Sequence, residues 1–138
     1  MNVSEVMVRD PVTVSPICLV YEVAKLMRDK EIGSVIIVDE TMVVGIATER
    51  DLVRRVLAGD RDPKKVRIKE VMSSPVISIS QSEDIVYAAQ LMKKQRIRRL
   101  AVMDGKNLVG ILTSDDMAQN MKRAAEDFAE MLILSHHL

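Results

Sequence analysis

The stretch 45-GIATERDL-52 and its later counterpart 110-GILTSDDM-117 decide the fold, because each joins the end of an apolar strand to the start of a helix. Thr48 and Thr113 lie 65 residues apart. The same offset aligns further pairs: Val6-Met7 with Val71-Met72, Leu26-Met27 with Leu91-Met92, and Val44-Gly45-Ile46 with Val109-Gly110-Ile111. One structural unit is therefore repeated twice, and two repeats suit a closed pair better than a solenoid.

The first repeat predicts the order strand, helix, strand, strand, helix. Residues 11–14 form a short strand, and Ser15-Pro16 provides an N-cap and a first-turn proline for a helix that carries Leu19, Val23, Leu26 and Met27. The β-branched runs at 34–39 and 42–47 predict two buried strands joined by a tight turn. A second helix runs from Glu49 to Ala58 and stops at Gly59.

The second repeat predicts the same order. Its elements are a strand at 76–79, a helix around 84–94, strands at 99–104 and 107–112, and a helix from Ser114. Residues 3–7 and 68–72 supply one helical turn at the start of each repeat. We expect four segments: repeat one at 1–60, a polar linker at 61–67, repeat two at 68–123, and a C-terminal helical extension at 124–138.

The composition narrows the class of protein. Hydrophobic residues make up 48% of the 138 residues, which supports a sizeable core. Lys plus Arg and Asp plus Glu both number 20, so no global charge attracts nucleic acid or anionic lipid. The lone Cys18, the absence of a signal segment and the short apolar runs predict a cytoplasmic protein that does not enter a membrane.

The repeated Thr-x-x-Asp allows two interpretations. Thr at an N-cap with an acidic residue three positions later is a capping box, which satisfies free backbone N–H groups at a helix start. Asp51 and Asp116 also sit where a buried strand ends, and ligands of α/β sheets settle at the carboxyl ends of strands. A carboxylate there can accept hydrogen bonds from the vicinal hydroxyls of a ribose.

The stretch 96-RIRRL-100 places three arginines at the entry of a strand in repeat two only. Arg98 and Arg99 align with Gly33 and Ser34. Such arginines can be half-solvated surface charges. Alternatively, because a guanidinium grips phosphate oxygens in pairs, they indicate a phosphate site in one repeat.

These motifs resemble the tandem cystathionine-β-synthase (CBS) domain pair, or Bateman module. The resemblance covers residues 1–120 and rests on 6-VMVRDPVTVSP-16, 71-VMSSPVISIS-80, 38-VDETMVVGIATERDL-52 and 103-MDGKNLVGILTSDDM-117. It implies an α/β (α+β) fold of two β-α-β-β-α repeats packed about a pseudo-twofold axis, with clefts between the repeats that hold adenosine derivatives. Ala101 stands where the family often has proline after the basic pair and an apolar residue.

The resemblance also implies site residues. Asp51, with Asp116 second, would bind ribose, Thr48 and Thr113 would add hydroxyl contacts, and Arg98, Arg99 and also Arg50 would reach phosphate. The residues implied to line the adenine are Thr13, Val14, Ile46, Ala47, Ile77, Ser78, Ile111 and Leu112, with core packing as the alternative for the apolar ones. In repeat one, Gly33 and Ser34 stand where repeat two has its pair of arginines, so the expectation of phosphate binding is weaker for repeat one.

No catalytic grouping or metal-ligand spacing can be assembled: the two histidines, His136 and His137, lie at the C-terminus, and Cys18 has no basic neighbour. We expect no enzymatic activity, no metal and no catalytic cofactor. The final helix outruns the repeat with apolar residues at spacing four, namely Met117, Met121, Ala125, Phe128 and Leu132. This stripe either folds back on its own unit or docks on a second subunit, and we expect a homodimer.

The leading hypothesis is a stand-alone regulatory sensor of an adenine nucleotide, AMP first and then ADP or ATP, that signals to an unknown protein. S-adenosylmethionine is an alternative ligand, and a ligand-free assembly module is another possibility. A nucleic-acid-binding protein would use Arg96, Arg98, Arg99 and the linker lysines. Zero net charge, with two Tyr and one Phe for base stacking, disfavours it.

Overall fold

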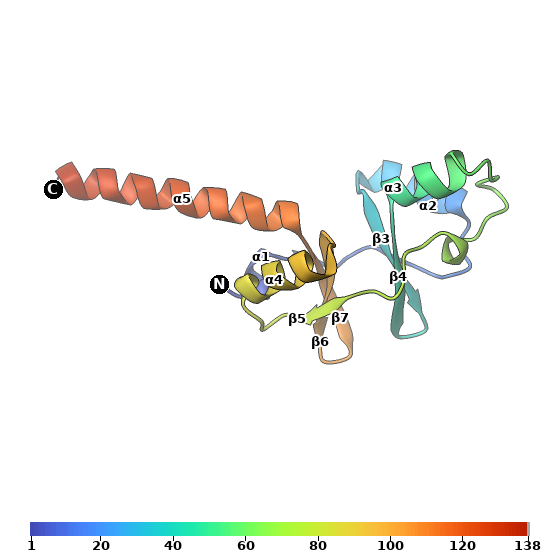
Figure 1. Ribbon diagram of the computed structural model, residues 1–138, viewed down its shortest axis with the longest axis horizontal. Helices are drawn as coiled ribbons and strands as arrows, with labels where there is room; N and C mark the ends of the chain where they lie inside the picture. Colours follow the sequence, from blue (N-terminus) through green and yellow to red (C-terminus); the bar gives the residue numbers. More distant parts are fainter. Residues whose placement is uncertain (138) are drawn as a thin grey trace. The chain divides into compact units, whose positions relative to one another are not determined.

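The computed structural model describes residues 1–137, with side chains as far as residue 134. The chain divides into two compact units. Unit 1 combines residues 1–9 with the chain from residue 78 onward, and unit 2 consists of residues 10–77. The first nine residues therefore pack with the second repeat, and the chain from 68 to 77 packs with the first. Each unit has its own sheet and its own helices (Figure 1).

Unit 2 is a three-stranded sheet in the order β2-β3-β4 with helices packed against it. Strand β2 is parallel to β3, and β3 forms an antiparallel hairpin with β4. The elements are β2 (Thr13–Val14), α2 (Val20–Lys30), β3 (Ser34–Asp39), β4 (Met42–Thr48), α3 (Glu49–Asp51), the π-helix η1 (Leu52–Leu57) and the 3-10 helix η2 (Ile68–Glu70).

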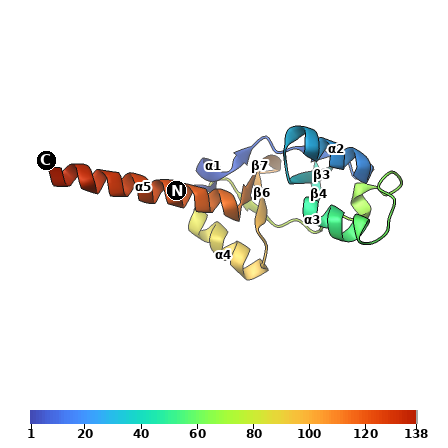
Figure 2. The same ribbon diagram turned by 90° about the horizontal axis from the view of Figure 1, so that it is seen from above.

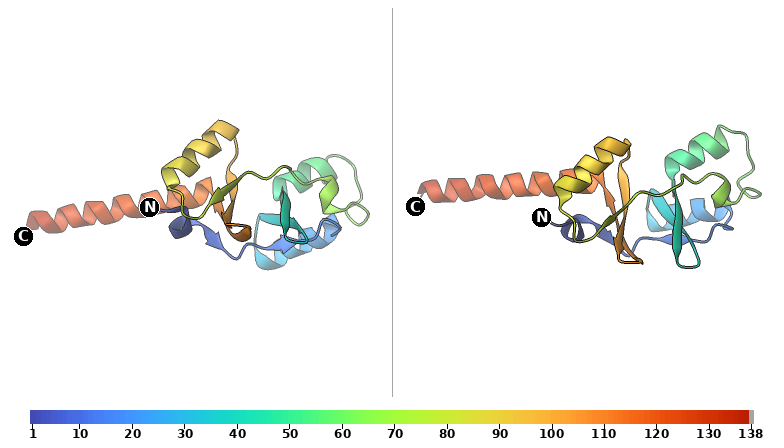
Figure 3. Two further views of the ribbon diagram at one scale, coloured as in Figure 1. Left: turned by 90° about the horizontal axis from the view of Figure 1, so that it is seen from below. Right: turned by 60° about the horizontal axis from the view of Figure 1, so that its bottom comes forward.

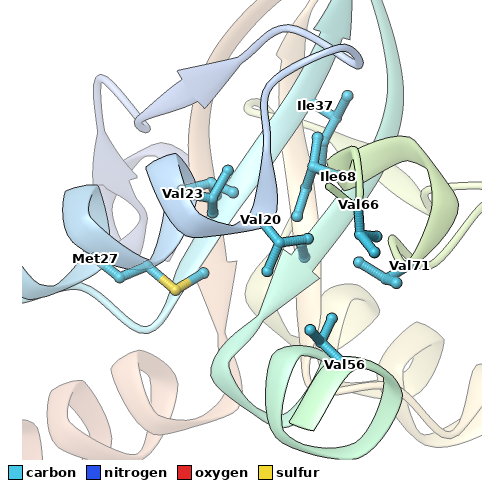
Figure 4. Packing of buried hydrophobic residues seen from close by; sticks show 10 residues of the cluster. Val20, Val23, Met27, Ile37, Val56, Val66, Ile68 and Val71 are labelled. Carbon is cyan, nitrogen blue, oxygen red and sulfur yellow. The ribbon is translucent and has the colours of Figure 1, made fainter. Parts of the chain in front are cut away.

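The core of unit 2 gathers side chains from every one of its helical segments except α3 (Figure 4). Val20, Val23 and Met27 come from α2, and Val56 comes from η1. They pack against the sheet through Ile37, while Val66, Ile68 and Val71 close the cluster. Because Ile68 and Val71 begin the second repeat, the core of unit 2 uses residues from both repeats.

The segment 61–67, predicted as a polar linker, is tied to α2. The N–H groups of Val20 and Tyr21 donate to the carbonyls of Val66 and Pro63 at 2.8 and 2.9 Å. Lys64 lies over the ring of Tyr21, with its Nζ 4.9 Å from the ring centre. Figure 3 shows this stretch looping from the end of η1 back to η2.

Unit 1 repeats the arrangement with a four-stranded sheet in the order β1-β7-β6-β5. The short strand β1 is antiparallel to β7, and β5 is parallel to β6. The elements are α1 (Val3–Val6), β1 (Val8–Arg9), β5 (Ser78–Ser80), α4 (Ile85–Gln95), β6 (Arg99–Asp104), β7 (Asn107–Thr113) and α5 (Ser114–His137). The predicted mixed fold of two repeats with an extended last helix is confirmed.

The predicted N-cap at Ser15-Pro16 is wrong. Helix α2 begins at Val20 with Leu19 as its N-cap, so the chain before it stays extended or turned. The physical reason lies in the carbonyl groups of this segment. Those of Pro16 and Cys18 accept hydrogen bonds from the N–H groups of Lys69 and Ile68, at 3.2 and 2.7 Å, and the N–H groups of Val20 and Tyr21, which would bond back to this segment in a helix, donate to Val66 and Pro63 instead.

The helix after the first hairpin occupies the predicted range but widens to a π-helix over its second half. The N–H of Ala58 donates to the carbonyl of Val53 at 2.8 Å, five residues earlier. Gly59 follows the helix as predicted, because a Cβ there would lie 2.6 Å from the carbonyl oxygen of Arg55. The left-handed residue is the next one, Asp60, with φ of 54°.

Helix α5 leaves its unit after its first turns. Its base lies between α1 and α4 (Figure 2), where Met117 is buried. Every described side chain from 121 to 134 is exposed. One predicted alternative was that the apolar stripe of this helix folds back onto its own unit. The structure does not show this for the described residues beyond Met117.

Gly110 allows β1 to pair closely with β7. A Cβ at this position would lie 2.8 Å from the backbone oxygen of Val8 and 2.6 Å from Sδ of Met7. At the equivalent Gly45 an added Cβ would meet only the flexible side chain of Met72. We expect Gly110→Ala to lower the free energy of unfolding by about 1–3 kcal/mol and Gly45→Ala to cost less. Urea unfolding of both variants checks this, and an equal loss would contradict it.

Candidate functional site

Both Thr-x-x-Asp motifs form complete capping boxes. In unit 2, the backbone N–H of Thr48 donates to Oδ2 of Asp51 at 2.9 Å, and the N–H of Asp51 donates to Oγ1 of Thr48 at 3.2 Å. In unit 1, the N–H of Thr113 reaches Oδ2 of Asp116 at 3.3 Å, and its hydroxyl donates to the same oxygen at 2.8 Å. The capping role is confirmed at both helix starts, and in each case it uses Oδ2 of the aspartate.

The other carboxylate oxygen, Oδ1, distinguishes the two aspartates. In unit 2, the hydroxyl of Ser73 lies 3.5 Å from Oδ1 of Asp51, and Nε of Arg55 lies 3.9 Å from it. Arg55 is held in place because its Nη1 also donates to the carbonyls of Val71 and Met72, at 3.0 and 3.1 Å. Both oxygens of Asp51 therefore have partners within the protein.

Asp116 keeps one oxygen available. No hydrogen bond or ion pair from the described residues reaches its Oδ1. The repeat explains the difference, because Val8 stands in place of Ser73 and Asn120 in place of Arg55. Asn120 donates its Nδ2 to the backbone oxygen of Asp116 at 2.9 Å rather than to the carboxylate. The sequence-based prediction did not include Ser73 and Arg55. The alignment of the two repeats contained a signal for them, because it pairs Ser73 with an apolar residue and Arg55 with an uncharged one.

The predicted phosphate arginines lie at the same end of the sheet as Asp116. Arg99 is paired with Thr113 across β6 and β7, and the N–H of Ser114 donates to the carbonyl of Arg98 at 2.9 Å. Arg98 is exposed, whereas Nε of Arg99 is buried and has no hydrogen-bond partner among the described residues. Arg99 as a whole is half-buried, so its guanidinium has one buried N–H that lacks an acceptor, and an anion is a suitable partner for such a group.

Unit 2 brings no such pair to its aspartate. Ser34 faces Thr48 in the register of β3 and β4, and Gly33 accepts a hydrogen bond from the N–H of Glu49 at 3.0 Å. Arg50, the remaining predicted phosphate residue, is exposed on α3. The predicted contrast between the repeats is thus present in the strand-entry residues of the two sheets.

Seven of the eight residues predicted to line the adenine fall into two groups. Residues that are paired on neighbouring strands lie on the same face of a sheet. Thr13 is paired with Ile36, which is paired with Ile46, so these three share a face. Ser78, Ala101 and Ile111 share a face of the other sheet in the same way. The side chains of the second group belong to the core or pack against it: Ala47 and Leu112 have no exposed area, and Val14 contacts the core of unit 2. Only backbone groups of Ala47 and Leu112 could meet a ligand. Ile77, half-buried, ends unit 2.

The remaining chemistry of the described residues is limited. They contain no cluster of three or more His, Cys, Asp or Glu side chains placed to hold a metal ion. Within the same part of the chain, no helix has the length and apolarity needed to span a bilayer. Cys18 is half-buried and packs against the core of unit 2.

Comparison with known proteins identifies the family. The CBS domain family matches the chain twice, over residues 3–58 and 68–123. The chain therefore belongs to the CBS-domain family. Its two copies in tandem make it a CBS pair, the regulatory arrangement known as a Bateman module.

Three proteins are similar to this chain over most of its length. It is 33% identical to the CBS domain-containing protein YhcV of Bacillus subtilis, over 98% of this chain and 96% of YhcV. It is 40% identical to the uncharacterized protein MK0525 of Methanopyrus kandleri over 86% of this chain, but spans only 62% of that relative. The CBS domain pair of protein MJ0100, in complex with 5′-methylthioadenosine and S-adenosyl-L-methionine, superimposes with a TM-score of 0.80 at 29% identity, covering 90% and 98% of the two chains.

Proposed function

We propose that this CBS pair is a non-catalytic regulatory module that binds an adenine nucleotide, with AMP as the preferred ligand and ADP or ATP as further candidates. The observation that carries the proposal is the asymmetry of the two capping boxes. In unit 1, an aspartate with one available oxygen shares the end of the sheet with two arginines. In unit 2, the corresponding aspartate has partners on both oxygens.

The proposed contacts follow from the donors and acceptors of the site. The ribose hydroxyls donate to Oδ1 of Asp116, while Oδ2 continues to cap α5. Arg98 and Arg99 bind the phosphate, and the buried Nε of Arg99 gains the acceptor that it lacks among the described residues. The base lies on the sheet face that carries Ser78 and Ile111. Two guanidinium groups match one phosphate, which favours AMP.

Asp51 is a second, weaker ribose site in this proposal. A ribose hydroxyl there has to displace the 3.5 Å contact with Ser73 or share Oδ1 with Arg55. Arg50 is the phosphate contact that remains near this box. The contacts therefore favour Asp116 over Asp51, which reverses the order suggested by the sequence.

S-adenosylmethionine is the second candidate ligand, because the MJ0100 pair was solved with it and with 5′-methylthioadenosine. Its adenosine group could use the same aspartate and the same sheet face. Its sulfonium carries a positive charge where AMP carries phosphate, so Arg98 and Arg99 disfavour it relative to AMP.

A binding module regulates by preferring one of two states. The bound nucleotide can change the state of the protein only through different affinities for the two arrangements. The regulated protein is a separate partner in this proposal. The protein that binds the nucleotide is a homodimer in this proposal, because the apolar side chains of α5 beyond its base are exposed.

Isothermal titration calorimetry with adenosine, AMP, ADP, ATP and S-adenosylmethionine tests the proposal. We expect AMP to bind more tightly than adenosine, and Arg99→Gln to remove most of that difference. Arg96→Gln is the matched control, because Arg96 belongs to the same basic run but is exposed at the C-cap of α4. If Arg99→Gln leaves AMP affinity unchanged, or if no nucleotide binds, the proposal is wrong. Tighter binding of S-adenosylmethionine than of AMP would select the second ligand.

A further inference from the structure

The two capping boxes differ in the residue that follows the threonine, which is Glu49 in unit 2 and Ser114 in unit 1. Both residues are anchored to the chain in the same way. The N–H of Glu49 donates to the carbonyl of Gly33 at 3.0 Å, and the N–H of Ser114 donates to the carbonyl of Arg98 at 2.9 Å. A carboxylate in unit 2 and a hydroxyl in unit 1 therefore start from equivalent places beside the entry of a strand.

The carboxyl group of Glu49 lies next to Gly33. A Cβ added at Gly33 would be 3.7 Å from Cδ and 3.8 Å from Oε1 of Glu49. Gly33 corresponds to Arg98 in the repeat, so this Cβ marks the place where the side chain of Arg98 begins in unit 1. Unit 2 thus has a carboxylate beside the position from which unit 1 extends a proposed phosphate-binding arginine.

Within the described part of the chain, no ion pair or hydrogen bond engages the Glu49 carboxylate, which is exposed. Arg50 and its counterpart in unit 1, Asp115, have the opposite contrast of charge. Both are exposed, and no contact holds either of them against the strand entry. The charge that is fixed beside the strand entry of unit 2 is therefore that of Glu49, next to the uncharged Gly33 and Ser34.

The position of this carboxylate affects a phosphate rather than a nucleoside. In unit 1 the proposed phosphate contacts are Arg98 and Arg99, so the equivalent place for a phosphate in unit 2 is beside Glu49. Like charges a few ångströms apart at a protein surface repel each other. The base would instead lie on the sheet face of Thr13 and Ile46, and an uncharged nucleoside has no phosphate for the carboxylate to repel.

We infer that Glu49 determines the ligand specificity of unit 2, which accepts a nucleoside but rejects a nucleotide. The inference rests on the proposed function, because it places the nucleoside in unit 2 as in unit 1. One AMP then binds per chain, in unit 1, and unit 2 prefers adenosine to AMP by about 10-fold. The two units of one chain would respond to opposite phosphorylation states of the same nucleoside.

NMR titration of the full chain with adenosine and with AMP tests this specificity. The backbone amide of Asp51 reports on unit 2 and that of Asp116 on unit 1. We expect unit 1 to prefer AMP and unit 2 to prefer adenosine. Glu49→Gln keeps the size of the side chain without its charge and should abolish the preference of unit 2. Glu40→Gln is the matched control, because Glu40 lies in the turn at the other end of the β3–β4 hairpin, and should keep that preference.

The reverse exchange tests the same position in unit 1. Ser114→Glu should weaken AMP binding there by about 10-fold and adenosine binding by less than about twofold. Ser114→Gln is the matched control, since it adds a side chain of the same size without the charge. Equal effects of the two variants on AMP binding would overturn the inference.

The outcomes separate this inference from the proposed function. If unit 2 prefers AMP, if adenosine does not bind to unit 2, or if Glu49→Gln keeps the wild-type preference, the inference is wrong. AMP binding by unit 1, and with it the proposed function, stands in each of these cases. If AMP binds to neither unit, the proposed function and the inference fail together.

Discussion

Replacing Ile68 with alanine is expected to lower the free energy of unfolding of unit 2 by about 2–5 kcal/mol. Ile68 has no exposed area and packs in the cluster that joins α2, η1 and the sheet (Figure 4). Its backbone N–H donates to the carbonyl of Cys18 at 2.7 Å, so the surrounding chain is fixed and cannot collapse into the space left by the side chain. Truncation therefore leaves a cavity in addition to the loss of apolar contact.

Urea unfolding followed by circular dichroism measures this effect. Ile17→Ala is the matched control, since Ile17 is the same residue type in the same unit but is 60% exposed, and its loss should be within about 0.5 kcal/mol. Similar losses for the two variants would show that Ile68 does not hold the first turn of the second repeat in the core of unit 2.

Asp116→Asn is expected to weaken AMP binding by about 10- to 100-fold while leaving α5 capped. The amide oxygen of asparagine can still accept the hydrogen bonds from the N–H and hydroxyl of Thr113. The amide nitrogen then stands in place of Oδ1 and presents hydrogens to the ribose hydroxyls instead of lone pairs. Binding is lost although the helix start is preserved.

Calorimetry and thermal unfolding together separate the two roles of Asp116. Asp116→Ala should lose binding and also about 1 kcal/mol of stability, because it removes the carboxylate half of the capping box. Asp51→Asn should weaken AMP binding less, since both oxygens of Asp51 already have protein partners. Asp115→Asn, next to the site and exposed, is the charge control. Equal loss of binding in Asp51→Asn and Asp116→Asn would contradict the assignment of unit 1 as the main site.

Much of the fold could be predicted because the pattern appears twice. Strands 34–39 and 99–104 were predicted from β-branched and apolar runs, and both occur with those bounds. The repeat could not predict which half of the chain the turns 3–7 and 68–72 join. Both end in Glu-Val-Met and begin with a β-branched apolar residue, and the choice depends on long-range packing rather than on local preference.

Part of the site also lies beyond sequence reasoning. The spacing of Thr48 and Asp51 predicts a capping box, but a box of this kind looks the same whether its second oxygen is available or not. Arg55 lies four residues after Asp51 on the same helix, so the sequence could have indicated this ion pair, whereas Ser73, 22 residues away, reaches Asp51 only through the fold. The π-helix η1 likewise has no recognisable signal in 52-LVRRVL-57.

Because residues 10–77 are inserted between the two pieces of unit 1, the chain has a built-in order of completion during synthesis. A ribosome delivers all of unit 2 while the partners of α1 and β1 are still unmade, so the first nine residues must wait for the C-terminal half. Removal of residues 1–9 would therefore leave unit 2 complete, whereas unit 1 would lack its edge strand β1.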